Sequence, residues 1–201
     1  RYNVVTWVHR ATRGWSYGAS VVDPRTGEIV KGFVLLGSQR VRQDRLIFEG
    51  LAGVEKTGTG LPDDPVQLAL DRIRQLSAHE VGHTIGLAHN FAASTYDRGS
   101  VMDYPAPWVR VSDTGTLDFS EAYATGAGVW DKFTIKWLYN DAIDHEALIA
   151  DAHDQGWIYV TDRQGRGAGT AHPKAAVWDN GNDPVAALAE AMAVRRIALD
   201  N

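Results

Sequence analysis

Three histidines and a glutamate are spaced in one stretch of the chain as metal-dependent hydrolysis requires. The stretch from His79 to His89 has the pattern H-E-x-x-H-x-x-G-x-x-H. On a helix, residues four apart lie on one face with Cβ atoms about 5–6 Å apart, so His79 and His83 can share one ion. Glu80 lies one step around the helix, where a carboxylate can act as general base beside the metal. The pattern therefore predicts a metal-dependent hydrolytic site.

A glycine explains how the third histidine joins the other two. Gly86 has no Cβ, so it can adopt a positive φ, end the helix and turn the chain until His89 completes the set. Three neutral imidazoles leave a fourth position open, as in catalytic rather than closed structural zinc sites. The shorter H-E-x-x-H pattern also arises in helices whose histidines are merely solvated or packed in a core. The extension to His89 favours the metal site.

A second motif follows eleven residues later, in the compact turn from Ser100 to Pro105, where Tyr104 comes two residues after Met102. A long histidine motif followed by such a Met-turn is the signature of the metzincin zinc endopeptidases, and the chain resembles that clan from about residue 19 to 105. The resemblance implies that Met102 forms a hydrophobic floor beneath the imidazoles and that Tyr104 hydrogen-bonds the oxyanion of the tetrahedral intermediate. The alternative for Tyr104 is a buried phenol bonded to the backbone.

The resemblance also implies a fold and an activity. We expect an α/β (α+β) fold in which a small twisted mixed sheet packs on the active-site helix and a mostly helical C-terminal part follows. Residues 1–201 would form one catalytic domain, with an upper part (1–89), a lower part (90–201) and a cleft between them. The activity would be zinc-dependent endopeptidase hydrolysis, with Glu80 as general base for the water that the zinc activates.

More narrowly, the chain is similar to the large bacterial zinc-dependent metalloproteases of unassigned role, in which such a domain belongs to a longer exported protein. Export is therefore expected, and this expectation rests on the resemblance alone because the chain itself contains no signal peptide. Asn90, directly after the third histidine, differs from the residue that marks the best-known subfamilies. Subfamily and cleavage preference therefore stay open.

Composition excludes several other classes of protein. The chain has 201 residues, of which 44% are hydrophobic, and no long apolar run, so we expect one domain with a substantial core and no membrane span. A net charge of −5 without basic clusters argues against nucleic-acid binding. The absence of cysteine excludes disulfides and thiolate ligands, so a metal must be held by His, Asp or Glu.

Local patterns predict the elements around the site. We expect a long helix from Pro65, capped by Asp64, to about Leu87. The other expected elements are strands at 3–9, 19–22, 28 to about 41 and 157–160, and helices at about 43–51, 130–139, 143–153 and 184–199. In the long helix, the apolar positions opposite His79 should face the core, leaving His79, Glu80 and His83 to line a cleft. These positions are Val66, Leu70, Ile73, Val81 and Ile85.

Three further stretches bear on ligands. The hairpin around residues 23–27 resembles the one that precedes the active-site helix in metzincins, which implies that a strand at the cleft edge pairs with an extended peptide substrate. The run from Trp178 to Pro184 is a candidate for calcium binding. It lacks the distal acidic ligand of a calcium loop, so a turn leading into the final helix is the favoured interpretation. The glycine-rich stretch 163–170 lacks the context of a phosphate-binding loop and is expected to be a surface turn.

Two alternatives to peptidase activity use the same residues. The first is a zinc-dependent hydrolase of a non-peptide amide. The second is a binding module that keeps the metal without cleaving, although the intact Glu80 argues against it.

The beginning of the chain raises a separate expectation. The first residues from Arg1 resemble folded strand, whereas metzincins begin with a strand and a long backing helix, which are not found before Asn3. The strand at 29–36 is apolar on both faces and requires cover on both. We therefore expect an N-terminally truncated domain whose sheet is covered by the final helix, by a second copy in a homo-oligomer or by an upstream segment.

Overall fold

The computed structural model describes residues 2–12 and 14–200, so Arg1, the first of the residues that resemble folded strand, lies outside the described residues. The chain forms two compact units. Unit 1 contains Arg1–Gly86, Pro107–Thr125 and Pro184–Asn201, and unit 2 contains Leu87–Ala106 and Gly126–Asp183. Two segments of the expected lower part, 107–125 and 184–201, thus group with the first 86 residues. None of the described helices has the length and apolar character needed to cross a membrane.

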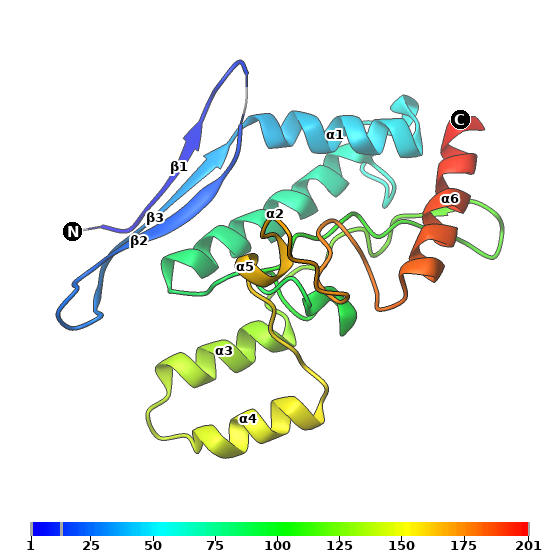
Figure 1. The fold of residues 1–201 in the computed structure, drawn as a ribbon. Helices are drawn as coiled ribbons and strands as arrows, with labels where there is room; N and C mark the ends of the chain where they lie inside the picture. Colours follow the sequence, from blue (N-terminus) through cyan, green and yellow to red (C-terminus); the bar gives the residue numbers. More distant parts are fainter. Residues whose placement is uncertain (1, 13, 201) are drawn as a thin grey trace. The chain divides into compact units, whose positions relative to one another are not determined.

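Unit 1 begins with a three-stranded mixed sheet, as expected (Figure 1). Its strands are β1 (Val4–Val8), β2 (Tyr17–Val22) and β3 (Ile29–Gly37), in the order β1-β3-β2. β1 runs parallel to β3, and β2 runs antiparallel to it across the predicted hairpin. The strand was expected to continue to about Val41, but β3 ends at Gly37 because the next helix begins at Gln39.

Two long helices of unit 1 follow the sheet (Figure 1). α1 (Gln39–Ala52) is longer than the short helix expected at 43–51, and it packs along α2 (Pro65–Thr84). α2 begins as predicted: Asp64 accepts a hydrogen bond from the backbone N–H of Val66, and Pro65 takes the first helical position. α2 also contacts β2 and β3, so it joins the sheet to α1.

The expected core face of α2 was wrong in part. Leu70 and Val81 are 41% and 44% exposed, whereas His79 and Glu80 are buried. The helix is covered by α1 and also by β2 and β3, so its buried surface includes the side that carries the histidines. The apolar pattern alone did not reveal this second cover.

The last helix, α6 (Pro184–Asp200), completes the core of unit 1. Its buried Val194 clusters with Phe48 of α1 and Leu68 of α2, and its main contacts are with α1 and β4 (Arg110–Val111). β4 pairs with β5 (Leu117–Asp118) in a stretch for which no strand was expected. The final helix therefore packs on the α1–α2 core and not on the sheet, whose cover by this helix was one of the three expected possibilities.

Unit 2 contains short helices joined by long irregular segments, so it is less helical than the expected lower part. It contains α3 (Val129–Tyr139), α4 (His145–Asp154), the short α5 (Asp162–Gly165) and a 3-10 turn at Ala93–Thr95. A second 3-10 turn, Val54–Lys56, lies in unit 1. The strand predicted at 157–160 is wrong: Val160 accepts a hydrogen bond from the N–H of Phe91 and donates to the Asn90 side chain, without a strand ladder. α5 also occupies the start of the expected glycine-rich turn. Its residues lie beside a core of Phe91, Ala92, Val160 and Ala175.

Candidate metal centre

The first two histidines lie in the last turns of α2. His79 and His83 are four residues apart, and their ring centroids are 4.8 Å from each other. His79 is 5% exposed and His83 is half-buried. The helical spacing thus brings the two imidazoles together as the sequence predicted.

α2 ends at Thr84, and Gly86 has a φ of 91°, the left-handed conformation expected of it. Its N–H donates to the carbonyl of His83, and His89 follows three residues later. His79, His83 and His89 each offer a ring nitrogen, and these atoms all lie within 4.8 Å of one another, so the three residues could hold a metal ion. Imidazole nitrogens suit zinc, and the donor set fits that ion without a thiolate.

Glu80 directly follows His79 in α2, is buried, and is held from β2. Its side chain is 4% exposed, and the backbone N–H of Gly18 donates a hydrogen bond to its carboxyl group. Burial raises the pKa of Glu80 to about 7, while the Gly18 N–H and the positive charge of Arg72 act in the opposite direction. The carboxyl group therefore has a fixed position and a hydrogen-bond donor that comes from the sheet.

Arg72 lies two turns before Glu80 on the same helix and is 5% exposed. Its guanidinium donates to the side chain of Gln75 and lies 5.5 Å from the ring centre of Tyr123. Asp44 on α1 is fully buried and pairs with Arg40 at 2.5 Å, and the charge of Arg72 also acts on it. Buried charges of both signs thus lie in the two helices α1 and α2 of unit 1.

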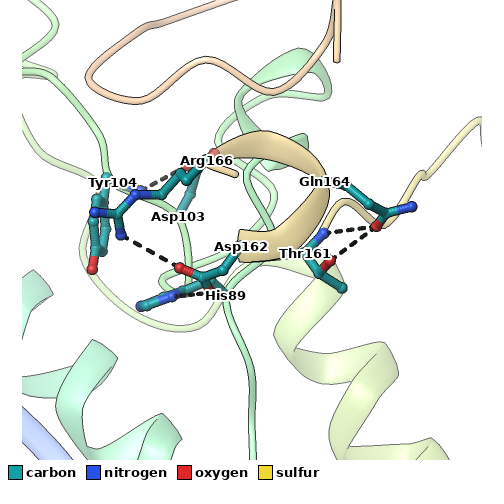
Figure 2. Close-up of polar contacts among 7 residues, drawn as sticks. All are labelled: His89, Asp103, Tyr104, Thr161, Asp162, Gln164 and Arg166. Atoms are coloured by element: carbon teal, nitrogen blue, oxygen red, sulfur yellow. Dashed lines mark hydrogen bonds and ion pairs between the residues drawn. The ribbon is translucent and has the colours of Figure 1, made fainter. Parts of the chain in front are cut away.

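The third histidine is held by a carboxylate. Nδ1 of His89 lies 2.7 Å from Oδ2 of Asp162 in α5. Figure 2 shows this contact between the two labelled side chains. A carboxylate only accepts hydrogen bonds, so Nδ1 carries the proton and Nε2 is left as the ligand nitrogen. Hydrogen bonds of this kind orient metal-binding histidines.

Tyr104 lies beside His89 within unit 2. The two ring centroids are 4.9 Å apart with their planes at 71°, and the phenol ring stacks on Trp178 at 5.3 Å. The ring also contacts Phe91 edge-on at 5.3 Å. The structure therefore brings Tyr104 next to a ligand candidate.

The Met-turn is anchored by the buried side chain of Asp131 and by a backbone hydrogen bond from Asn90. Asp131, at the start of α3, accepts hydrogen bonds from the hydroxyl of Ser100 and from the backbone N–H of Val101. Met102 is 1% exposed, and its carbonyl accepts the N–H of Asn90, the residue after the third histidine. Asn90 is fully buried, and its side-chain amide bonds Ala92, Tyr96, Ile158 and Val160. The departure at position 90 thus has a structural reason, since an amide can donate and accept in these four bonds.

Sequence reasoning missed two residues that touch the site residues. Gly18 has no motif of its own, and Asp162 is 73 positions from the histidine that it contacts. Helix-capping residues flank Asp162, because Thr161 and Gln164 form a capping box around α5, but this pattern marks a helix start and says nothing of a metal. The stretch 178–184, which offered the calcium alternative, leads into α6. Within it, Oδ2 of Asp179 accepts a hydrogen bond from the Ser94 hydroxyl at 3.3 Å.

Comparison with known proteins supplies the family. A model of the family described as Met-zincin matches residues 62–201, which include the histidine motif, the Met-turn and all of unit 2. No curated protein and no solved structure matches the chain. The matched region covers well over half of the sequence, and its motifs are those around which the site is built. The chain belongs to the Met-zincin family.

Proposed function

We propose that the protein is a zinc-dependent endopeptidase. The observation that carries the proposal is the group of His79, His83 and His89 together with the buried carboxyl group of Glu80, which lies on α2 with the first two histidines. Bound zinc would polarise the scissile carbonyl and lower the pKa of the attacking water. Family membership supports this chemistry, and the residues below supply the remaining parts of the reaction.

Glu80 is proposed as the general base. It accepts a proton from the water that attacks the peptide carbonyl, and it delivers that proton to the amine as the C–N bond breaks. The N–H of Gly18 holds the carboxyl group in one orientation, and burial excludes competing water from it. The side chain is therefore prepared for transfer in both directions without a large movement.

Tyr104 is proposed as the donor to the oxyanion. Its ring is held on one side by Trp178 and on another by His89, which fixes the direction of the phenol. An oriented donor that bonds charge formed only in the transition state raises kcat rather than substrate affinity.

A peptide substrate is proposed to lie along β2. This strand is at the edge of the sheet, and its Gly18 is the residue that touches Glu80. An extended peptide that adds to such an edge gains backbone hydrogen bonds, and it would pass close to the general base. This arrangement favours peptide substrates over small non-peptide amides.

The test is a comparison of the parent protein with Glu80→Gln. After loading with zinc, both are incubated with a casein-type substrate, a panel of unstructured peptides and a panel of small non-peptide amides. We expect one zinc per chain in both proteins, internal cleavage of peptides by the parent, and nearly complete loss of cleavage in Glu80→Gln, since an amide cannot accept the proton.

Other outcomes would identify the alternatives. Turnover of small amides without peptide cleavage would indicate a non-peptide hydrolase. Zinc binding without any turnover by the parent would indicate a binding module. Activity of Glu80→Gln within a few-fold of the parent would show that another group is the base.

A further inference from the structure

Asp162 uses its two carboxylate oxygens for two different partners (Figure 2). Oδ2 lies 2.7 Å from Nδ1 of His89, and Oδ1 lies 3.4 Å from a guanidinium nitrogen of Arg166, one turn later in the chain. The carboxylate therefore connects a ligand candidate to a positive charge. Each contact is made by a separate oxygen, so neither displaces the other.

The guanidinium of Arg166 returns the connection to the Met-turn. It lies 5.3 Å from the ring centre of Tyr104 and 5.7 Å from that of Phe91, both within the range of cation–π contacts. Tyr104 in turn packs edge-on against His89. The four side chains of His89, Asp162, Arg166 and Tyr104 thus form a closed ring of contacts within unit 2.

The position of Asp162 is set by the start of α5. Asp162 is the first residue of this short helix, and the Gln164 side chain accepts hydrogen bonds from the backbone N–H and the hydroxyl of Thr161, as Figure 2 shows. These bonds fix the backbone on the N-terminal side of the carboxylate. The side chain is therefore presented to His89 from an ordered turn.

Stability alone is a poor explanation for these contacts. The side chains of Asp162 and Arg166 are 53% and 46% exposed, and exposed ion pairs of this kind contribute only about 0–1 kcal/mol. The His89 side chain is 14% exposed, so of the two partners of the Asp162 carboxylate the better covered is the ligand candidate. The contacts thus act mainly on the orientation of that imidazole.

We propose that Asp162 is a positioning residue of the metal site, which fixes the tautomer and ring orientation of His89, while Arg166 holds the carboxylate from its place over the Tyr104 ring. The inference deepens the proposed function, on which it rests for the role of His89 as a ligand. A carboxylate on Nδ1 keeps the proton there and increases the basicity of Nε2. Loss of such a partner reduces metal affinity by about 10–100-fold.

The experiment uses Asp162→Ala in the same chain and two readouts that need no turnover. Zinc affinity is measured by competition with a chromophoric chelator, and the tautomer of His89 is read in the metal-free protein from ring ¹⁵N chemical shifts. We expect the variant to bind zinc about 10–100-fold more weakly and to lose the defined Nδ1–H tautomer. The melting temperature of the metal-free protein should change by no more than a few degrees, as for other exposed ion pairs.

A matched control is Asp154→Asn. Asp154 also lies beside a histidine, with its Oδ1 3.9 Å from Nδ1 of His153, but both side chains are more than four-fifths exposed and neither belongs to the three-histidine group. We expect its zinc affinity to equal that of the parent. If Asp162→Ala does not fold, Asp162→Asn keeps the shape of the side chain with a neutral acceptor and should still weaken zinc binding.

Zinc affinity within two-fold of the parent together with an unchanged His89 tautomer would overturn the inference. The outcome is distinguishable from failure of the proposed function. A parent that binds zinc but cleaves no peptide would refute the peptidase assignment and leave the role of Asp162 measurable by both readouts.

Discussion

The backbone of Gly18 in β2 approaches the backbone of Glu80 so closely that no side chain fits between them. A Cβ added to Gly18 would lie 1.8 Å from the carbonyl oxygen of Glu80. At the same position, the N–H of Gly18 donates to the Glu80 carboxyl group. One glycine therefore sets both the distance of the edge strand from α2 and the orientation of the proposed base.

Gly18→Ala should disturb the site more than its single methyl group suggests. Because the contact is with backbone rather than with a flexible side chain, strand and helix must separate, at a cost of about 1–3 kcal/mol. We expect a lower melting temperature and a reduced kcat/KM, measured on the same preparation. Gly50→Ala is the control: Gly50 lies in α1 with open space around it, so alanine should stabilise the protein by about 1 kcal/mol. Equal behaviour of the two variants would contradict this account.

His83→Ala should abolish zinc binding, because it removes one of three proposed ligands. Metal content after dialysis, determined by elemental analysis, provides the measurement. His145→Ala is the control, since that imidazole contacts the carbonyl of Trp137 and is not in the group of three. Full zinc occupancy in His83→Ala would remove the basis of the proposed site.

Tyr104→Phe should reduce kcat by about 10²-fold with little change in KM, as expected when one oxyanion donor is lost. Tyr96→Phe is the matched control, because the Tyr96 hydroxyl donates to the carbonyl of Ile158 and accepts from Asn90. That variant should lose about 1 kcal/mol of stability and keep its kcat. Unchanged kcat in Tyr104→Phe would leave the phenol with a packing role through Trp178 and His89.

Local sequence patterns were sufficient for the parts of the site that lie close together in the chain. Four-residue spacing predicted the pairing of His79 and His83, and the glycine at 86 predicted the end of the helix. Contacts between distant segments left no such pattern. Gly18 reaches Glu80 from the sheet, and Asp162 reaches His89 from 73 residues away.

The same limit explains the errors in the fold. Helical periodicity placed Val81 in the core, because it could not show which side of α2 is covered by β2 and β3. Residues 157–160 have the composition of a strand, but Val160 bonds the Asn90 side chain instead of a partner strand. In both cases a tertiary contact decided the outcome against the local pattern.

The last prediction concerns the start of the helix that carries the site. Asp64 is 1% exposed, and its carboxylate accepts hydrogen bonds from the backbone N–H groups of Gly58, Gly60 and Val66. These bonds, with that from Gly58 first, lower the pKa of Asp64 below its ordinary value. A carboxyl group whose pKa is lower in the folded than in the unfolded state stabilises the fold fully above the unfolded value of about 4. That contribution is lost as the pH falls through the lower, folded value.

Asp64→Asn should therefore lower the melting temperature most at pH 7, where the parent carboxylate is charged, and progressively less below about pH 4. Thermal unfolding of both proteins between pH 2 and pH 7 tests this. Asp63→Asn is the control. The Asp63 carboxylate, next to Asp64 in the chain, makes a part-exposed ion pair with Lys56 at 3.0 Å, so its loss should change the melting temperature little. A difference between parent and Asp64→Asn that stays constant with pH would show that the charge of Asp64 does not stabilise the start of α2, and that the shape of the cap alone does.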